Sequence, residues 1–411
     1  MSRRVVVTGM AGLCPLGADW KSAGDALRSG RSAVTRLPEW DEIEGLAVKI
    51  GAPVPEFAVP PDEYPRKKTR AMGRLSLLAT RASDLALRDA GLRDDPVLSS
   101  GRAGVAYGSS NGSPPAIGVY ARQLFVGKTI KGIAASDYLQ IMSHTCAANI
   151  AAFFGLRGRV IPTCSACTSG SQGIGYAYET IKHGMQDVMI GGGAEELHAI
   201  DGAIFGVLFA ASTRNAEPQR TPRPFDLDRD GMVCGEGAAT LVLEELERAR
   251  ARGARIHAEV VGYATNCDGR HLTNPDPSGM QQVMSMGLAD AGVPAEAIGY
   301  VSAHGTGTEA GDIAESRATF EVFGDRVPVS TQKGHFGHTL GACGAIESWL
   351  AIEMMREGWF APTLNLESLD PRCAPLDYIQ GEPRRIEAEW VANHNFAFGG
   401  VNTSLIFRRW A

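Results

Sequence analysis

The sequence predicts an α/β fold made of two related halves. Apolar runs of strand length alternate with stretches of helical spacing along most of the 411 residues, which is typical of α/β folds with largely parallel sheets. Near residue 250 the pattern starts again, because the strand expected at 255–261 and the Gly-rich loop behind it repeat the strand at 4–8 and the loop at 9–17. We therefore expect an N-terminal half, residues 1–250, and a C-terminal half, residues 251–411.

The individual elements follow from local periodicity. Short apolar runs predict strands at 4–8, 105–108, 188–193, 239–243, 255–261, 298–302 and 327–330. Apolar residues at helical spacing predict helices at 18–30, from the basic stretch 66–74 to about Ala90, and at 139–154, 278–291, 309–323 and 341–356. The stretch from Glu39 to Pro65 is expected to be surface loop, and the pair 391–398 and 402–409 a final hairpin.

Composition excludes several classes of function. Hydrophobic residues make up 44% of the chain and charged residues 21%, an ordinary globular balance. The net charge of −6 gives no case for whole-chain nucleic-acid binding, and no apolar run reaches the roughly 18 residues of a membrane span. Eight scattered cysteines in a chain of this length indicate a reducing cytoplasm rather than a disulfide framework.

The stretch around Cys167 has the pattern of a nucleophile. The apolar run Val160–Ile161 leads towards the cysteine, small residues follow it, and apolar residues then recur at helical spacing as far as Ile181. Cys167 is therefore expected at a strand-to-helix turn, where the partial positive charge and free N–H groups of a helix N-terminus lower the pKa of a thiol. The chemistry that suits such a thiolate is attack on a thioester to form an acyl-enzyme.

Two other interpretations of this stretch stay open at the level of residues. A cysteine beside small residues is often a buried core residue. Cys164-Ser-Ala-Cys167 is also a Cys-x-x-Cys pair, as in redox and zinc sites. The sequence contains no second such pair, and thioredoxin-like motifs belong to a much smaller fold.

Three further clusters each stand near the end of an expected strand. They read Ala303-His304-Gly-Thr306-Gly-Thr308 with Asp312 and Glu315, Lys333-Gly-His335-Phe-Gly-His338 with Glu347, and Asn395-Phe-Ala-Phe398-Gly399-Gly400. Polar side chains at strand ends point into a cleft at the carboxyl edge of a sheet. A single histidine there is usually structural, but two histidines and a cysteine at a helix N-terminus form a catalytic constellation.

The sequence gives no support for a bound metal. His335-x-x-His338 has no acidic neighbour on the same turn, as a metal pair would want. The stretch Asp226-x-Asp-x-Asp-Gly resembles a calcium loop, but it lacks the terminal glutamate at EF-hand spacing. We therefore expect no metal site.

These motifs resemble those of the β-ketoacyl-acyl carrier protein synthases of the ketosynthase I/II type, the elongating condensing enzymes of fatty acid and polyketide synthesis. The resemblance covers essentially the whole chain, with its motifs in the family's order. It implies a thiolase fold, in which two pseudo-symmetric halves form a five-layer αβαβα sandwich, and a homodimer. It also implies an acyltransferase that condenses malonyl carrier protein with an acyl chain held on Cys167, with loss of carbon dioxide and elongation by two carbons.

The resemblance implies roles for the residues nearest the reaction. Cys167 corresponds to the nucleophile, and His304 and His338 to the pair that drives decarboxylation and stabilises the enolate. Phe398 corresponds to the gating phenylalanine, whose backbone N–H forms the oxyanion hole with that of Cys167. Gly399 belongs to the same turn.

Other positions correspond to supporting residues of the family. Lys333 corresponds to the lysine of an ionic network, with Glu315 as its expected partner and Asp312 and Glu347 as further members. The positions that contact the phosphopantetheine arm correspond to Thr273, Thr306 and Thr308. The basic cluster that docks the carrier protein corresponds to Arg66, Lys67, Lys68, Arg70 and Arg74, although a solvated helix start would show the same charges.

The resemblance implies no metal or organic cofactor, since the substrates arrive on the 4'-phosphopantetheine of an acyl carrier protein. The expected acyl pocket departs from the family, because it carries the polar residues Asn111, Asp137, Tyr138 and Gln140. Unpaired polar groups beside a saturated chain are costly. We therefore expect a short, conjugated or polar acyl chain, as in polyene pathways. The resemblance gives no role to Cys164 or to His335.

Three alternatives are weighed against this interpretation. A silent chain-length factor would lack the cysteine, although an active subunit can pair with such a factor in a heterodimer. A degradative thiolase would want a second catalytic cysteine near the C-terminus, and residues 395–402 contain none. A non-catalytic acyl- or carrier-binding protein would not need Cys167, His304 and His338 together.

Overall fold

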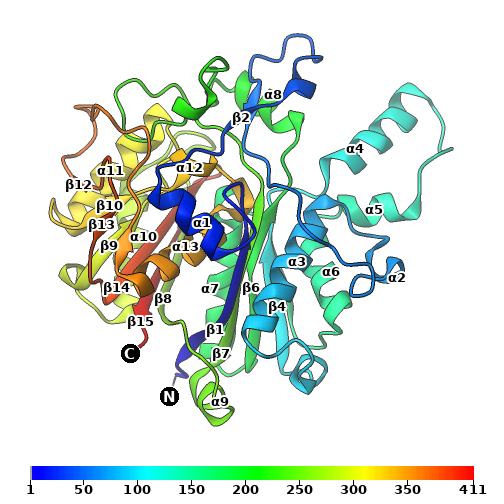
Figure 1. Ribbon diagram of the computed structural model, residues 1–411, viewed down its shortest axis with the longest axis horizontal. Coiled ribbons are helices and arrows are strands. Elements are labelled where there is room, and N and C mark those ends of the chain that lie inside the picture. The colour runs from blue at the N-terminus through cyan, green and yellow to red at the C-terminus, as the bar shows by residue number, and fades with distance from the viewer. Residues whose placement is uncertain (1) are drawn as a thin grey trace.

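The computed structural model describes residues 2–411 and contains one large mixed sheet (Figure 1). Its eleven strands follow the order β12-β10-β9-β14-β15-β8-β1-β7-β6-β4-β5. Their bounds are β1 Val5–Leu13, β4 Ala103–Gly108, β5 Val160–Thr163, β6 Val188–Glu195, β7 Gly237–Glu245, β8 Ala258–Cys267, β9 Ile298–Ser302, β10 Pro328–Ser330, β12 Asp377–Tyr378, β14 Trp390–Ala397 and β15 Val401–Arg409. Two small ribbons pair β2 Thr35–Arg36 with β3 Ile50–Gly51 and β11 Trp359–Phe360 with β13 Arg384–Arg385.

The two halves of the sheet have the same topology. In the first half the five main strands lie side by side in the order β5-β4-β6-β7-β1. Counted along the chain, these are the third, second, fourth, fifth and first strands of that half. In the second half β10-β9-β14-β15-β8 repeats that order, with the same parallel and antiparallel pairings. The ladder between β1 and β8 joins the two halves.

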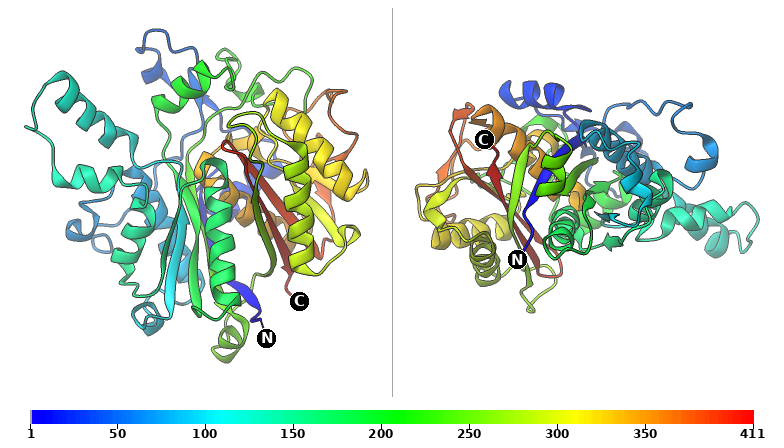
Figure 2. Two further views of the ribbon diagram at one scale, coloured as in Figure 1. Left: turned by 180° about the vertical axis from the view of Figure 1, so that it is seen from behind. Right: turned by 90° about the horizontal axis from the view of Figure 1, so that it is seen from below.

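The two halves of the sheet form two layers, and helices form the other three (Figures 1 and 2). The helices are α1 Trp20–Arg28, α2 Arg66–Thr69, α3 Arg74–Asp89, α4 Pro114–Ala121, α5 Ala135–Ile141, α6 Thr145–Phe154, α7 Ser169–Lys182, α8 Ala199–Val207, α9 Leu246–Ala251, α10 Pro277–Ala291, α11 Glu309–Phe323, α12 Lys333–Phe336 and α13 Cys343–Glu357. The helices α7 and α13 pack against each other and against strands of both halves. The helices α3 and α6 cover the outer face of the first half, and α10 covers that of the second half with α11 packed on it. This is the αβαβα arrangement of the thiolase fold.

Close backbone contacts explain the small residues of the central layer. A Cβ atom on Gly173 of α7 would lie 2.4 Å from the carbonyl oxygen of Gly192 in β6, and one on Gly193 would lie 2.5 Å from that of Gly341. No L-residue with a side chain fits at those distances. The glycines therefore let the buried helix and the turn before α13 sit directly on the sheet.

Three sequence-based expectations about the fold need correction. The sheet is mixed rather than largely parallel, because β1, β7, β8 and β15 all lie antiparallel to their neighbours at its centre. The helix expected at 139–154 is two helices, α5 and α6, separated at Met142–His144. The helix α4, the π-helical turn Arg122–Val126 and α5 form an arm that projects from the body, and α4 was not predicted (Figure 1).

Among residues 2–411, no helix combines the length and the apolar character needed to cross a membrane.

Candidate active site

Cys167 lies where the sequence places it, in a turn between a strand and a buried helix. The short turn Ala166–Thr168 connects β5 to α7, and Ala166 adopts a left-handed backbone with φ of 50°. Such a conformation is unusual for a residue with a Cβ atom and marks a constrained turn. The hydroxyl of Thr163 donates to the carbonyl oxygen of Ser169 at 2.8 Å, which fastens the end of the strand to the start of the helix.

The expected low pKa of Cys167 is wrong for the resting thiol. Burial raises the pKa of Cys167 to about 12, and the nearby ammonium of Lys333 opposes that rise only in part. The Nε2 atom of His338 lies 3.0 Å from the Cys167 Sγ atom, close enough to hydrogen-bond a thiolate when one forms.

The two histidines are buried, close together and neutral. The rings of His304 and His338 have centroids 5.1 Å apart and stand nearly perpendicular, at 87°. Burial, with the charge of Lys333, holds the pKa of each histidine well below its usual range. Both imidazoles are therefore uncharged near neutral pH.

The environment of His304 determines which of its ring nitrogens carries the proton. Its Nδ1 atom lies 3.4 Å from Lys333 Nζ and 3.3 Å from the side-chain nitrogen of Asn395. Both of those groups are donors without acceptor capacity, so Nδ1 must accept. The proton of neutral His304 therefore lies on Nε2.

Lys333 is fully buried and pairs with Glu347, not with the expected partner Glu315. Burial alone would lower the pKa of Lys333, but the Glu347 carboxylate raises it above its ordinary value, so the lysine stays charged. Its Nζ atom also donates to the backbone carbonyl of His304 at 2.6 Å. Asn395 donates to Glu347 at 2.7 Å and so links the pair to His304.

Glu315 instead holds the backbone beside the histidine. Its two carboxylate oxygens accept the N–H groups of His304 at 2.6 Å and Gly305 at 2.7 Å. Asp312, one turn earlier on α11, accepts those of Thr306 at 3.0 Å and Gly307 at 3.2 Å. The sequence gives no means of deciding which carboxylate reaches Lys333, because 315 and 347 both lie on helices that pack near it.

A cavity of about 340 Å³ leads to these residues. Cys167, His304 and His338 line its inner end, and the expected arm-binding residues Thr273, Thr306 and Thr308 line its walls. The hydroxyls of Thr306 and Thr308 lie 2.9 Å apart. The structure thus brings Cys167, the two histidines and the three threonines to one cavity.

Phe398, Gly399 and Gly400 form the turn between β14 and β15, and Phe398 and Gly400 line the same cavity. Gly399 and Gly400 have φ of 91° and 72°, which only glycine adopts without strain, and Gly399 N donates to Leu272 O at 2.7 Å. The Phe398 ring is 39% exposed and lies 6.0 Å from the ring of Phe205. Sequence reasoning assigned no role to Phe205, whose only signal is its place in the apolar helix α8.

The basic cluster divides into two groups. All five residues are exposed, and two of them also bind to the rest of the fold through their side chains. Lys68 donates to the carbonyl of Phe153 at 2.8 Å, and Arg74 forms a bidentate pair with buried Glu236 at 2.6 and 2.7 Å. Lys68 and Arg74 therefore hold the fold together locally.

The four expected acyl-pocket residues lie at the base and on the helices of the projecting arm. Asn111 and Tyr138 are exposed, and the carboxylate of Asp137 accepts the N–H of Ala134 at 2.8 Å as a cap of α5. Gln140 accepts the N–H of Ser113 through its backbone carbonyl. The polar character of Asp137 thus has a local structural reason.

The ligand atoms of Cys167, His304 and His338 lie within 4.8 Å of one another, as metal ligands would. The buried ammonium of Lys333, next to His304, opposes a divalent cation by charge.

Cys164 is exposed and its Sγ atom contacts the carbonyl of Ser110 at 3.1 Å. His335 is buried between the carbonyls of Arg31 and Pro362, so its contacts are structural.

Fold and site together define a class, the thiolase-fold proteins with one cysteine and two neutral histidines at the inner end of a cavity. Residues 2–249 match the family described as Beta-ketoacyl synthase, N-terminal domain, and residues 257–367 match Beta-ketoacyl synthase, C-terminal domain. The chain belongs to the beta-ketoacyl synthase family, whose members are condensing acyltransferases.

Known relatives resemble the chain over its full length. It is 38% identical to the 3-oxoacyl-[acyl-carrier-protein] synthase 2 of Vibrio cholerae, with 99% of each chain covered. A crystal structure of a beta-ketoacyl synthase from Burkholderia phymatum is 56% identical, with a TM-score of 0.97 and full coverage of both chains. A type II PKS ketosynthase, solved in complex with its acyl-carrier protein and bound to the hexaketide, is 29% identical, with a TM-score of 0.90 and full coverage of both chains.

Proposed function

We propose that this protein condenses malonyl carrier protein with an acyl chain held as a thioester on Cys167. The observation that carries the proposal is the meeting of Cys167, His304 and His338 at the inner end of one cavity. The product is a β-ketoacyl thioester two carbons longer than the acyl chain. The half 1–250 supplies the nucleophile and the half 251–411 supplies the histidines.

In the first step the Cys167 sulfur attacks the acyl thioester delivered by the carrier. The thiol proton leaves to water, and the N–H of His338, 3.0 Å away, stabilises the thiolate. The carbon–sulfur bond to the carrier breaks, and the departing pantetheine thiolate takes a proton from water. The exchange of one thioester for another needs no redox partner and no metal.

In the second step the malonyl thioester loses carbon dioxide. The electron pair of the broken carbon–carbon bond moves onto the thioester as an enolate, which the N–H groups of the neutral histidines His304 and His338 stabilise. Neutral imidazoles suit this step, because each keeps a proton to donate. Lys333 and Asn395 keep His304 in the required tautomer.

In the third step the enolate carbon attacks the acyl carbonyl on Cys167. The backbone N–H groups of Cys167 and Phe398 stabilise the tetrahedral oxyanion. Gly399 lets the chain turn directly behind Phe398, and its own N–H is taken by the carbonyl of Leu272. A single donor of this kind typically contributes about 3–4 kcal/mol to lowering the barrier. Collapse expels the Cys167 thiolate, which regains a proton from solvent.

The carrier reaches the site from outside. Thr273, Thr306 and Thr308 contact its phosphopantetheine arm, and Arg66, Lys67 and Arg70 attract its acidic surface. No metal or organic cofactor takes part. All eight cysteines are unpaired, in keeping with a reducing cytoplasm.

A second copy of the chain completes the assembly. The arm carries exposed apolar side chains, among them Phe125 at 72%, Val126 at 80% and Ile130 at 76% exposed. The edge strand β5 presents Val160 at 43% exposed. Unpaired sheet edges and groups of exposed apolar side chains mark interfaces, so we propose a homodimer through β5 and the arm. A silent chain-length factor of the same fold is the alternative partner.

The acyl chain is short, conjugated or polar. Asn111, Tyr138 and Gln140 lie at the base or on the helices of the arm, a dimer would place the arm at the acyl pocket, and polar groups beside a saturated chain are costly. A preference for saturated acyl chains would indicate fatty acid synthesis, and a preference for short, conjugated or polar chains would indicate a specialised pathway. The second candidate function, a non-catalytic acyl-carrier-binding protein, requires only the cavity.

The test mixes the purified protein with malonyl carrier protein and a panel of saturated, short and polyenoic acyl carrier proteins. Intact-mass spectrometry follows acyl loading, with Cys167→Ala as the test variant and Cys164→Ala as its matched control. Loading that Cys167→Ala abolishes, followed by β-ketoacyl product, supports the proposal. Folded protein that loads from no carrier, alone or with its partner subunit, overturns it.

A further inference from the structure

Two carboxylates of α11 hold four consecutive backbone N–H groups of the loop 304–308. Glu315 accepts from His304 and Gly305, and Asp312 accepts from Thr306 and Gly307. The two acids lie three residues apart, on one face of the helix. The loop thus has a histidine half held by Glu315 and a threonine half held by Asp312.

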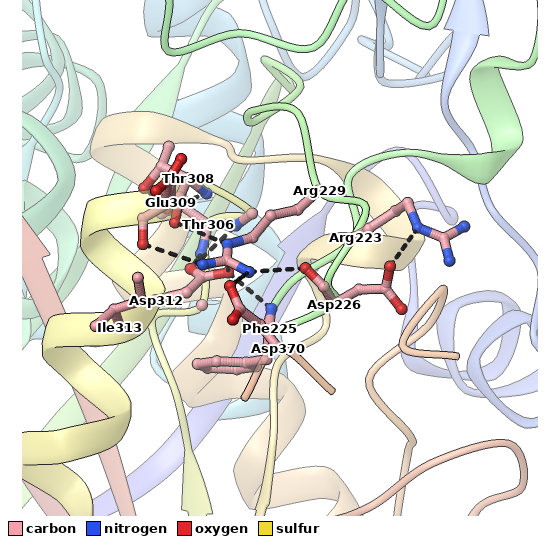
Figure 3. A network of polar contacts seen from close by, with 12 residues as sticks. Arg223, Phe225, Asp226, Arg229, Thr306, Thr308, Glu309, Asp312, Ile313 and Asp370 are labelled. Carbon is pink, nitrogen blue, oxygen red and sulfur yellow. Dashed lines mark hydrogen bonds and ion pairs between the residues drawn. The ribbon is translucent and has the colours of Figure 1, made fainter. Parts of the chain in front are cut away.

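Asp312 is in turn held by a buried cation (Figure 3). The side chain of Arg229 is 2% exposed, and its Nε atom lies 3.6 Å from Asp312 Oδ2. The other guanidinium nitrogens donate to Asp370 at 2.7 Å and to the backbone carbonyl of Glu309 at 3.2 Å. A planar guanidinium can make these contacts together, whereas a lysine ammonium cannot.

The segment that carries Arg229 also contacts the loop through its backbone. Phe225 N donates to Asp312 at 2.7 Å, and Gly231 N donates to Gly307 O at 3.1 Å. Gly307 has φ of 80°, and a Cβ atom there would lie 3.1 Å from Gly231 O. The threonine half is therefore fixed on its inner side, while Thr306 and Thr308 line the cavity.

We propose that Arg229 and Asp312 are positioning residues that set Thr306 and Thr308 for the phosphopantetheine arm. The inference rests on the proposed function, because it takes that arm as the occupant of the cavity. Neither residue acts on the reacting carbons. Their substitution should weaken use of the arm more than it slows chemistry, whereas substitution of Glu315 should disturb His304.

The experiment compares two malonyl thioesters as decarboxylation substrates. Malonyl-pantetheine carries the whole arm, and malonyl-N-acetylcysteamine carries only its last part. We expect Asp312→Asn to lower kcat/KM about ten-fold or more on malonyl-pantetheine, mainly through KM, and less than about three-fold on the truncated thioester. Arg229→Lys should act in the same direction. The control Glu367→Gln removes a carboxylate that pairs with Arg223, six residues before Arg229, at 3.1 Å, and it should affect both thioesters equally.

A cycle with the threonines tests the route of the effect. In a Thr306→Ala, Thr308→Ala background, Asp312→Asn should add less than about two-fold, because the groups it positions are gone. Equal losses on both thioesters, or full additivity in that background, would overturn the proposal. Should neither Asp312→Asn nor Arg229→Lys fold, equal losses in the threonine variant would also overturn it.

Failure of the proposed function gives a different result. Wild-type protein that decarboxylates neither thioester counts against the condensing reaction. In that case the affinity for pantetheine, measured by calorimetry on wild type and on Asp312→Asn, still tests whether Asp312 positions the threonines. Equal affinities would overturn the inference.

Discussion

The Nε2 atom of His338 lies 3.0 Å from the sulfur of Cys167, although the two residues come from different halves of the fold. Cys167 precedes α7 and His338 follows α12, and both turns end at the layer where α7 packs on α13. Neither half alone contains the site. Substitution of His338 should therefore change the reactivity of the Cys167 sulfur directly.

The two histidines should differ in which step they affect. His304→Ala should retain acyl loading of Cys167 and lower condensation about 100- to 1,000-fold, because only the enolate loses a donor. His338→Ala should slow both steps, since it removes the group beside the sulfur. Loading measured by intact mass and product measured by chromatography separate the two. A folded His304→Ala protein that fails to load would contradict the assignment, and His183→Ala, on the C-terminal cap of α7, is the control.

Lys333 should matter for stability as well as for activity. Lys333→Met leaves the Glu347 carboxylate buried without its cation, which should lower the free energy of unfolding by about 3–5 kcal/mol. The double variant Lys333→Met, Glu347→Leu should recover most of that loss, because an apolar pair needs no compensation. Activity should stay low in both, since His304 loses one of the two donors at its Nδ1 atom. Denaturant unfolding and the condensation assay measure the two effects, and a single variant as stable as wild type would refute the first.

His394 should make stability depend on pH below the usual histidine range. Burial lowers the pKa of His394 to about 3, and its ring packs beside Phe323 and Phe396 with centroids 5.9 and 6.5 Å away. Between about pH 3 and 6.5 the unfolded chain binds more protons at this site, so its contribution is full above pH 6.5 and is lost as pH falls. At pH 5 the loss should be about 2 kcal/mol.

The measurement is the difference in unfolding free energy between pH 7.5 and pH 5. His394→Leu should shrink that difference by about 2 kcal/mol relative to wild type. The same pH slope in His394→Leu and in wild type would contradict the prediction.

Local patterns predicted most of the helices and strands. The helix expected at 309–323 has those bounds, and the turn at Cys167 and the hairpin β14–β15 lie where periodicity and glycine place them. Whether neighbouring strands run parallel or antiparallel was not predictable, because apolar runs of the same length occur in both kinds of ladder. The arm was missed because its apolar residues face outward, so α4 lacks the one-sided pattern of a helix on a core.

Long-range contacts account for the errors at the site. The partner of Lys333 is 14 residues away on α13, and a rival carboxylate at 315 is equally suitable by residue type. The pKa of Cys167 depends on burial by segments from both halves, whereas the sequence revealed only the helix behind it. Asn395 stood in a recognised motif, but its link between Glu347 and His304 exists only after folding.

The exposed basic residues should control affinity for the carrier rather than chemistry. Lys67→Glu with Arg70→Glu should raise KM for malonyl carrier protein about ten-fold at low salt, with a smaller effect at high salt, because charges on the surface are screened. KM for carrier-free malonyl-pantetheine should not change. Lys68→Met removes one charge instead of reversing two, so it should raise that KM less, and it should also lower stability because Lys68 donates to the carbonyl of Phe153. An equal rise in KM for both substrates would contradict a docking role.

The apolar arm should decide the oligomeric state. Val126→Glu with Ile130→Glu places two carboxylates where we propose that a second copy packs, and burying unpaired charges there costs several kcal/mol. Light scattering should show wild type at twice the chain mass of 43.6 kDa and the variant at that mass. Phe209→Glu is the control, because Phe209 is 94% exposed and lines the cavity rather than belonging to the arm, so its substitution should leave the mass unchanged. The variant should also lose selectivity among acyl chains, since Tyr138 and Gln140 would no longer reach the partner. A variant that stays dimeric would remove the arm from the interface and leave the edge of β5 as the surface to test.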